Sequence, residues 1–119
     1  MKRICTFMLS ALALPLSLSA QTTTPPTGYK MVWSDEFNGT SLDTKVWNIE
    51  ENGNGGGNQE LQYYRKENVA VANGNLVLTA RRENYNNKQF TSGRINSRDK
   101  AYFKHGIIQA RIKFPKTAN

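Results

Sequence analysis

The stretch GNQELQYY, residues 57–64, concentrates side chains that form hydrogen bonds and stack on flat surfaces. It holds amides, one carboxylate and two phenols: Asn58, Gln59, Glu60, Gln62, Tyr63 and Tyr64. Amides and carboxylates pair with hydroxyl groups, and aromatic rings stack on apolar C–H faces. These residue types favour a sugar ligand, but an exposed polar edge strand would have the same composition.

Side-chain alternation divides this stretch into two faces if it is extended. Glu60, Gln62 and Tyr64 would then share one face, and Gln59, Leu61 and Tyr63 the other, because successive strand residues point to opposite sides. Leu61 is the only aliphatic residue of the stretch, so its face is expected to be the core side.

Hydrolysis of a glycosidic bond requires two carboxyl groups, about 5–5.5 Å apart when configuration is retained. The obvious pairs are neighbours in the chain, Asp35-Glu36 and Glu50-Glu51, which a strand would point to opposite faces. Glu60 has no neighbouring acid. These residues predict binding but supply no hydrolytic pair.

Several other chemistries have little support. His105 is the only histidine, and Cys5, the only cysteine, lies in the N-terminal leader, so histidine and cysteine cannot build a metal centre. No G-x-S-x-G motif accompanies His105, and no Lys-Ser/Thr follows the glycine-rich run 53–57, which is interpreted as a mobile loop. Basic residues alternate along the expected strands rather than cluster, so no nucleic-acid partner is predicted.

The elements that would position these residues are short strands. Residues 68–82 predict a hairpin, with Val69 and Val71 before an Asn73-Gly74 turn and Leu76, Leu78 and Ala80 on one face after it. Residues 106–114 (GIIQARIKF) also alternate and predict a strand with one apolar face.

Residues 90–98 form a further expected strand whose shared face is polar through most of its length: Phe90, Ser92, Arg94, Asn96 and Arg98. A polar strand face near an apolar one suggests the floor of a groove. Trp33, Phe37 and Trp47 are interpreted as core anchors near the N-terminal strand. The pattern as a whole predicts an all-β sandwich or barrel.

Residues 1–20 have the pattern of a secretory signal peptide, with Lys2 and Arg3 before an apolar run and Ala20 before the expected cleavage point. Its removal leaves 14 Lys and Arg against 9 Asp and Glu, a formal charge of +5. Residues 21–28 (QTTTPPTG) are interpreted as a linker, and residues 29–119 as a folded portion. The protein is expected to be secreted or periplasmic, with no membrane association after cleavage.

Three segments together resemble glycoside hydrolase family 16, in its laminarinase and β-glucanase branch. They are VWSDEFNGTSLD, GNQELQYYRKENVAVANGNLVLTARRE and FTSGRINSRDKAYFKHGIIQARIKFPK, in family order over nearly all of residues 32–116. The resemblance implies a concanavalin-like jelly-roll β-sandwich with a glycan cleft. It also implies endo-acting, retaining hydrolysis of β-1,3- or mixed-linked β-1,3/1,4-glucans, by a full-length protein expected to be monomeric.

The resemblance also assigns residues. Asn58 and Glu60 are expected near the cleavage point and Arg94 on the groove floor, and the wider substrate-binding set adds three neighbours: Tyr64, Arg65 and Ser92. No cofactor is required. A structural calcium would use the carbonyls of Glu36 and Gly74, together with an acid from a later part of the domain.

The family's catalytic signature, Glu-x-Asp-x-x-Glu, does not occur in residues 1–119. The catalytic acids are therefore expected after Asn119, in a longer domain of which this chain is the N-terminal part. That portion alone is expected to be inactive. The alternative interpretation is a non-catalytic secreted glycan-binding module, and the glycan linkage stays open.

Overall fold

The computed structural model describes residues 24–116, and these divide into two separate units. In the first, residues 24–34, a turn is closed by the Tyr29 amide donating to the Pro26 carbonyl (3.0 Å), with Gly28 at a φ of +87°. Trp33 of this unit is 40% exposed. Within residues 24–116, the strands and 3-10 turns lie in the second unit, which begins at Asp35.

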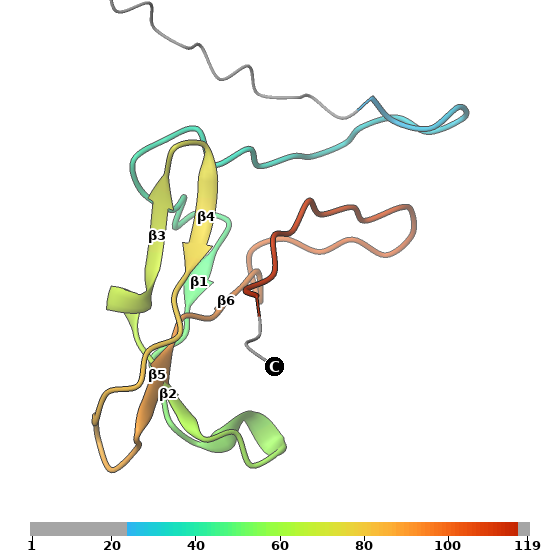
Figure 1. Cartoon of the computed structure of the whole chain (residues 1–119). Helices are drawn as coiled ribbons and strands as arrows, with labels where there is room; N and C mark the ends of the chain where they lie inside the picture. The colour runs from blue at the N-terminus through green and yellow to red at the C-terminus, as the bar shows by residue number, and fades with distance from the viewer. Residues whose placement is uncertain (1–23, 117–119) are drawn as a thin grey trace, which may run out of the picture. The chain divides into compact units, whose positions relative to one another are not determined.

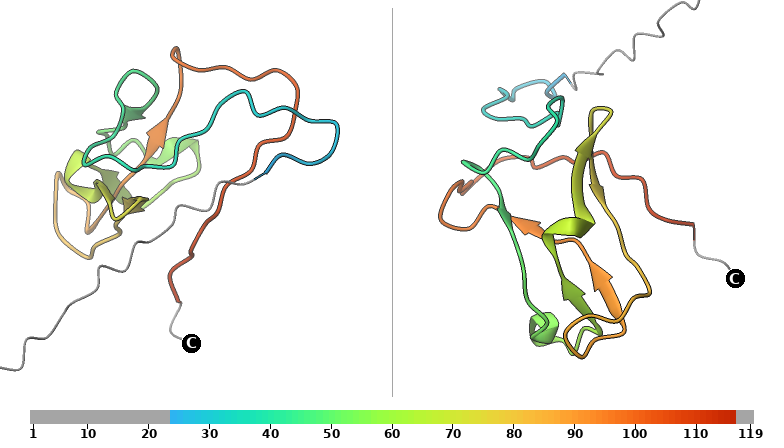
Figure 2. Two further views of the ribbon diagram at one scale, coloured as in Figure 1. Left: turned by 90° about the horizontal axis from the view of Figure 1, so that it is seen from above. Right: turned by 90° about the vertical axis from the view of Figure 1, so that its left-hand side faces the viewer.

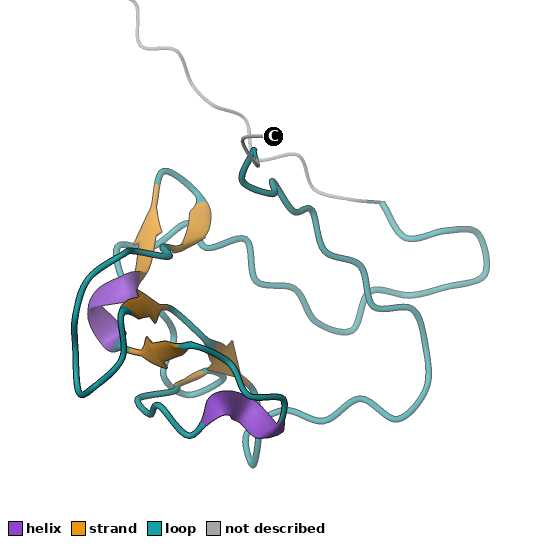
Figure 3. Ribbon diagram, turned by 60° about the horizontal axis from the view of Figure 1, so that its bottom comes forward, coloured by secondary structure: helices purple, strands orange, loops and turns teal. Residues whose placement is uncertain are grey.

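The second unit consists of short strands joined by long irregular segments, and the prediction of an all-β chain is confirmed (Figures 1 and 3). The strands are β1 (Asn48–Ile49), β2 (Gln62–Tyr64), β3 (Val69–Ala72), β4 (Asn75–Leu78), β5 (Phe90–Ser92) and β6 (Ile95–Asn96). Two 3-10 turns, η1 (Gly55–Gly57) and η2 (Lys66–Asn68), flank β2. No helix among the described residues is long and apolar enough to cross a membrane.

The β3–β4 hairpin confirms its sequence signal. Val69 pairs with Leu78 and Val71 with Leu76, which places these four side chains on one face. Asn73 and Gly74 have φ values of +51° and +69°, as a tight turn between twisted strands requires. Val71 is buried, and Figure 1 shows β3 and β4 as two neighbouring arrows joined by this turn.

The other two strand pairs form the region of the predicted binding residues. β2 runs parallel to β5, with Tyr64 beside Ser92, and Figure 2 shows the two arrows side by side. β1 is antiparallel to β6, with Asn48 beside Asn96. The segment after β1 continues to β2, because the Tyr64 amide donates to the Asn52 carbonyl (2.8 Å).

A polar centre holds these strands together. Asn68 and Thr91 are each only 1% exposed, and the Asn68 amide donates to the Thr79 carbonyl (2.7 Å) and to Thr91 Oγ1 (3.0 Å). Buried polar groups are tolerated where they find partners. Asn68 therefore links the end of η2 to the segment after β4 and to β5 through side-chain hydrogen bonds.

Two expectations about apolar faces are wrong in this structure. Residues 106–114 form no strand, and Ile108, Ile112 and Phe114 are 83%, 63% and 76% exposed, because no described strand pairs with this segment or covers its apolar side. Leu61 is 69% exposed whereas Tyr64 is 8% exposed, so the face with Glu60 and Tyr64 is the enclosed one. Polar side chains packed around the Tyr64 ring provide that enclosure.

The proposed aromatic anchoring is partly visible. The Phe37 and Trp47 rings lie 6.3 Å apart between centroids, and the Trp47 indole N–H donates to Asp35 Oδ2 (2.7 Å). Asp35 Oδ1 accepts from the Phe37 amide (2.9 Å), at a position where Phe37 has a φ of +50°. One carboxylate thus fixes both rings of the loop before β1.

Candidate functional site

One polar face carries most of the predicted binding residues. Along the chain, Glu60, Gln62 and Tyr64 project to the same side of β2, as alternation predicts. The Tyr64 hydroxyl donates to Glu60 Oε2 (2.6 Å), and the Gln62 amide donates to the Tyr64 hydroxyl (2.8 Å) and to Glu60 Oε2 (3.4 Å). The three side chains form a closed triangle.

Arg94 extends over this triangle from the segment between β5 and β6. Its Nη1 lies 3.6 Å from Glu60 Oε2, and its guanidinium carbon lies 5.3 Å from the centre of the Tyr64 ring. Its Nε lies 3.5 Å from Glu50 Oε1, a carboxylate that follows β1. Arg94 is therefore the shared counter-ion of two carboxylates from separate segments, one after β1 and one before β2.

The β1–β6 pair extends the same face with amides. The Asn96 amide donates to Glu50 Oε1 (2.8 Å), and the Asn48 amide donates to Asn96 Oδ1 (3.2 Å) and to the Arg98 carbonyl (2.8 Å). Glu50 is the member that sequence reasoning missed, because it was considered only as a neighbour of Glu51. The signal was the polar alternation of Asn48, Glu50 and Asn52 in the sequence.

Asn58 joins the face from the loop before β2. With its amide oriented to suit both neighbours, its nitrogen donates to Glu60 Oε1 (3.0 Å) and to the Gly55 carbonyl (2.9 Å). Lys88 reaches the backbone carbonyl of Glu60 (3.4 Å) from the other side of β2. The Glu60 carboxylate thus accepts hydrogen bonds from three side chains, Asn58, Gln62 and Tyr64. Lys88 contacts its backbone carbonyl, and Arg94 is its ion-pair partner.

Burial is the main reason that the pKa of the Tyr64 phenol is raised above its ordinary value of 10.0. The hydrogen bond to the Glu60 carboxylate adds to this effect, because a phenolate there would face a negative charge. The phenol therefore stays protonated and donates to Glu60 at neutral pH.

Arg65 does not join this face. Its guanidinium lies 3.2 Å from Glu67 Oε2, 3.4 Å from Glu83 Oε1 and 3.9 Å from the centre of the Tyr85 ring. Those contacts hold Arg65 among structural partners on the side opposite Tyr64. Ser92 is half-buried beside Tyr64 in the strand register, so it lies at the site without a side-chain contact that would assign it a role.

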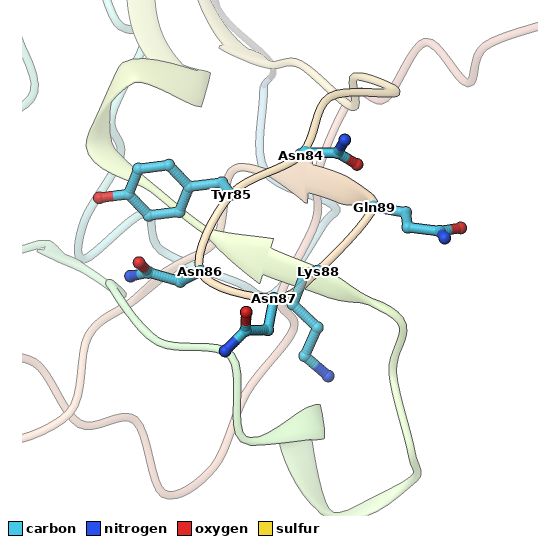
Figure 4. Close-up of a pocket in the computed structure, with 6 residues that line it drawn as sticks. All are labelled: Asn84, Tyr85, Asn86, Asn87, Lys88 and Gln89. Carbon is cyan, nitrogen blue, oxygen red and sulfur yellow. The ribbon is translucent and has the colours of Figure 1, made fainter.

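A second polar feature lies at the tip of residues 84–89. The loop closes through mutual Tyr85–Lys88 backbone hydrogen bonds of 2.9 Å, and Asn86 and Asn87 have φ values of +43° and +62°. Figure 4 shows a hollow lined by Asn84, Tyr85, Asn86, Asn87, Lys88 and Gln89. The two asparagines are explained by the turn, since Asn tolerates the left-handed region.

The two segments expected to bind calcium lie near each other. A Cβ placed on Gly74 would be 3.6 Å from Asn38 Oδ1, so the loop that contains Glu36 approaches the hairpin turn. Among residues 24–116, no group of three or more His, Cys, Asp or Glu side chains is placed to hold a metal. The expected ligands from Glu36 and Gly74 are backbone carbonyls, and calcium remains a prediction.

The described strands carry carboxylates, amides, an arginine and a tyrosine on one face, and these groups can pair with hydroxyl groups of a ligand. A family model described as "Beta-glucan synthesis-associated protein SKN1/KRE6/Sbg1" matches residues 8–119. The chain belongs to this family, within the laminarinase-type group of glycoside hydrolase family 16.

The relatives agree with this membership. The chain is 38% identical to a β-glucanase of Rhodothermus marinus over 119 residues, covering 97% of this chain and 42% of that protein. It is 48% identical to the clotting factor G alpha subunit of Tachypleus tridentatus over 90 residues, covering 73% of this chain and 13% of that protein. The chain thus spans less than half the length of these curated relatives.

Solved structures agree in fold. The laminarinase catalytic domain from Thermotoga petrophila matches with a TM-score of 0.60 and 40% identity over 65% of this chain and 34% of that one. The laminarinase from Rhodothermus marinus matches with a TM-score of 0.55 and 47% identity over 60% of this chain and 30% of that one. The expected jelly-roll class, incomplete in this chain, is confirmed.

Proposed function

We propose that the polar face built on Glu50, Glu60 and Arg94 binds a β-glucan, in an endo-acting and retaining hydrolase of β-1,3- or mixed-linked β-1,3/1,4-glucans. The observation that carries the proposal is the convergence of both carboxylates on Arg94, next to the Tyr64 ring. Planar charged groups and amides pair with sugar hydroxyls, and they are placed here by four different segments of the chain.

The proposed role of this face is binding and not bond cleavage. Both carboxylates of the face, Glu50 and Glu60, are engaged by the same side chain, Arg94, and they serve here to hold that arginine. Catalytic acids are proposed to come from other parts of the family domain.

The names of the relatives support the polymer more firmly than the reaction. They include a β-glucanase and a glucan endo-1,3-β-glucosidase, while the matched family description concerns β-glucan synthesis. One solved relative is described with 1,3-β-D-cellobiosyl-glucose at its active site. A β-glucan is named in all of these descriptions, whereas hydrolysis and synthesis are not named in all of them. The proposed ligand class therefore has broader support than the proposed reaction.

The test is calorimetric binding of laminarin by the 119-residue chain and by two variants. Arg94→Ala should weaken binding about 10- to 100-fold, because hydrogen bonds to a charged group contribute about 1.5–3 kcal/mol. The matched control is Arg82→Ala, since Arg82 is exposed and outside the polar face. Equal loss in both variants, or no binding of laminarin by the parent chain, would rule the proposal out.

A hydrolysis assay on the same samples tests whether the polar face binds glucan without cleaving it. A non-catalytic glycan-binding module and a binding segment of a hydrolase both bind laminarin without releasing sugar. Release of reducing ends by the purified chain would contradict the assignment of this face to binding alone.

We further propose that the protein is exported and acts outside the cytoplasm as a monomer, without a nucleic-acid partner. The support is the leader pattern of residues 1–20, whose structure lies outside the described residues, and the polymeric nature of the proposed ligand. A structural calcium bound through Glu36 and Gly74 is an additional proposal, supported by the approach of Asn38 to Gly74.

A further inference from the structure

The Glu60 carboxylate is already surrounded by donors of its own chain. Its Oε2 accepts from Tyr64 at 2.6 Å and lies 3.6 Å from Arg94, while its Oε1 accepts from Asn58 at 3.0 Å. A carboxylate has about four acceptor positions, and Gln62 occupies a further one at 3.4 Å. Few acceptor positions of the Glu60 carboxylate therefore remain for a sugar hydroxyl.

The remaining side of this carboxylate lies against the glycine-rich turn. A Cβ on Gly56 would be 2.6 Å from Glu60 Oε2 and 2.9 Å from Oε1, so only a residue without a side chain allows this approach. The Gly55 carbonyl accepts from the Glu60 amide (3.1 Å) and from the Asn58 amide (3.0 Å). The turn that contains Gly55, Gly56 and Asn58 thus packs against Glu60 and holds it in place.

Arg94 is better placed to meet a ligand than Glu60 itself. The Arg94 side chain is 42% exposed, compared with 21% for Glu60. Arg94 still has donors directed away from its two carboxylate partners, because a guanidinium carries five N–H groups. Its orientation depends on Glu60 and Glu50, since these are its two ion-pair partners on the face.

We propose that Glu60 is a positioning residue: held against Gly56 and bonded by the nearly buried Tyr64 hydroxyl, its carboxylate orients the Arg94 guanidinium, and Arg94 contacts the glucan. This inference rests on the proposed function and deepens it, because it separates the group that touches the sugar from the group that places it. It also gives the glycine-rich run a role, which is to admit the carboxylate at close range.

The chain offers a matched pair of variants for the test. Gly56 and Gly57 have φ values of +57° and +82°, so alanine is strained at both positions. A Cβ at Gly57 meets nothing within 4 Å, whereas a Cβ at Gly56 collides with the Glu60 carboxylate. Gly57→Ala therefore controls for backbone strain, and Gly56→Ala adds displacement of Glu60.

Two measurements are needed. The first is the titration of the Tyr64 phenol, followed by NMR on protein with carbon-13 at tyrosine Cζ and assigned with Tyr64→Phe. The second is calorimetric binding of laminarin. Gly56→Ala should lower the Tyr64 titration midpoint and weaken binding about 10-fold, as expected for loss of a charge-assisted hydrogen bond. Gly57→Ala should change neither.

Glu60→Gln provides the same test without added bulk, which decides the matter if Gly56→Ala does not fold. It should lower the Tyr64 midpoint and weaken binding to a similar extent. Equal effects of the two alanine variants, or an unchanged Tyr64 titration in both Gly56→Ala and Glu60→Gln, would overturn the inference. If the parent chain does not bind laminarin, the proposed function fails, and the Tyr64 titration alone still decides whether Glu60 positions its neighbours.

Discussion

At the scale of single residues, Arg94 and Tyr64 determine what the polar face can do. Arg94 is partly exposed, so its ion pairs with Glu50 and Glu60 contribute little to folding stability. Their consequence is orientation, because two carboxylates on different strands restrict one guanidinium. Tyr64 combines a nearly buried ring with a hydroxyl that bonds both Glu60 and Gln62.

The raised pKa of Tyr64 predicts a loss of stability in alkali. The phenol ionises at a higher pH in the folded chain than in the unfolded chain, mainly because it is buried. Its contribution to the free energy of unfolding is therefore complete below about pH 10 and falls as the pH rises through the folded-state pKa. Urea unfolding of the parent and of Tyr64→Phe between about pH 8 and pH 11 measures this.

The lower end of the pH range serves as the control, because the Tyr64 phenol of the parent is protonated there in both the folded and the unfolded chain. The difference in stability between parent and variant should shrink as the pH rises. A difference that stays constant across the range would contradict the assigned burial of Tyr64.

At the scale of elements, the positions of β2, β5 and β6 depend on a few close contacts. Asn68 and Thr91 link the end of η2 to β5, and Thr91 Oγ1 donates to Glu83 (2.5 Å), which also contacts Arg65. Gly93, directly before Arg94, is buried where β5 ends. We expect Arg94 to reach Glu60 only while Gly93 stays packed closely against Asn68 and Val69.

Gly93→Ala is therefore expected to destabilise the chain by about 1–3 kcal/mol, the usual range for overpacking. A Cβ there would meet the Asn68 carbonyl and would lie 2.9 Å from Val69 Cγ2, and the Asn68 carbonyl cannot move without loss of its hydrogen bond from Thr79. Chemical denaturation measures the loss. Gly39→Ala is the matched control, because the nearest atom to its Cβ would be 3.6 Å away.

The same variant links the element to the site. Gly93→Ala should also weaken laminarin binding, since Arg94 follows directly and would be displaced. If the Gly93→Ala protein were as stable as the Gly39→Ala protein, Gly93 would not be packed against Asn68 and Val69 as closely as these contacts indicate.

At the scale of the whole chain, the leader pattern and the glucan-binding proposal both predict that the protein acts outside the cytoplasm. A polysaccharide too large to cross a membrane is met outside the cytoplasm, and residues 1–20 carry a positive start, an apolar run and a small residue before Gln21. Residues 21–119 contain no cysteine, so they form no disulfide among themselves.

Expression of residues 1–119 in an export-competent bacterium is expected to give a periplasmic or secreted product that begins at Gln21. Intact-mass measurement and N-terminal sequencing identify the cleavage point. Ala20→Arg is the control, because a bulky charged residue directly before the cut should block cleavage. A cytoplasmic product that retains Met1 would contradict the export proposal.

Local rules account for much of what could be predicted. The Asn73-Gly74 hairpin and the shared face of Glu60, Gln62 and Tyr64 depend on turn chemistry and on a two-residue period, and both follow from short segments. The strand expected at 106–114 had the same kind of signal and is absent. Alternation predicts which side chains of a strand share a face, but it does not predict which other strand will pair with it.

By itself, therefore, the sequence determined the all-β class and the family, and it predicted four residues that the structure brings to one polar face: Asn58, Glu60, Tyr64 and Arg94. Only the tertiary structure brought Glu50 to Arg94 and turned Arg65 away toward Glu83. The physical reason is register. Which residues of β1, β2, β5 and β6 lie side by side depends on buried contacts such as Asn68–Thr91, which join segments far apart in the chain and leave no local pattern.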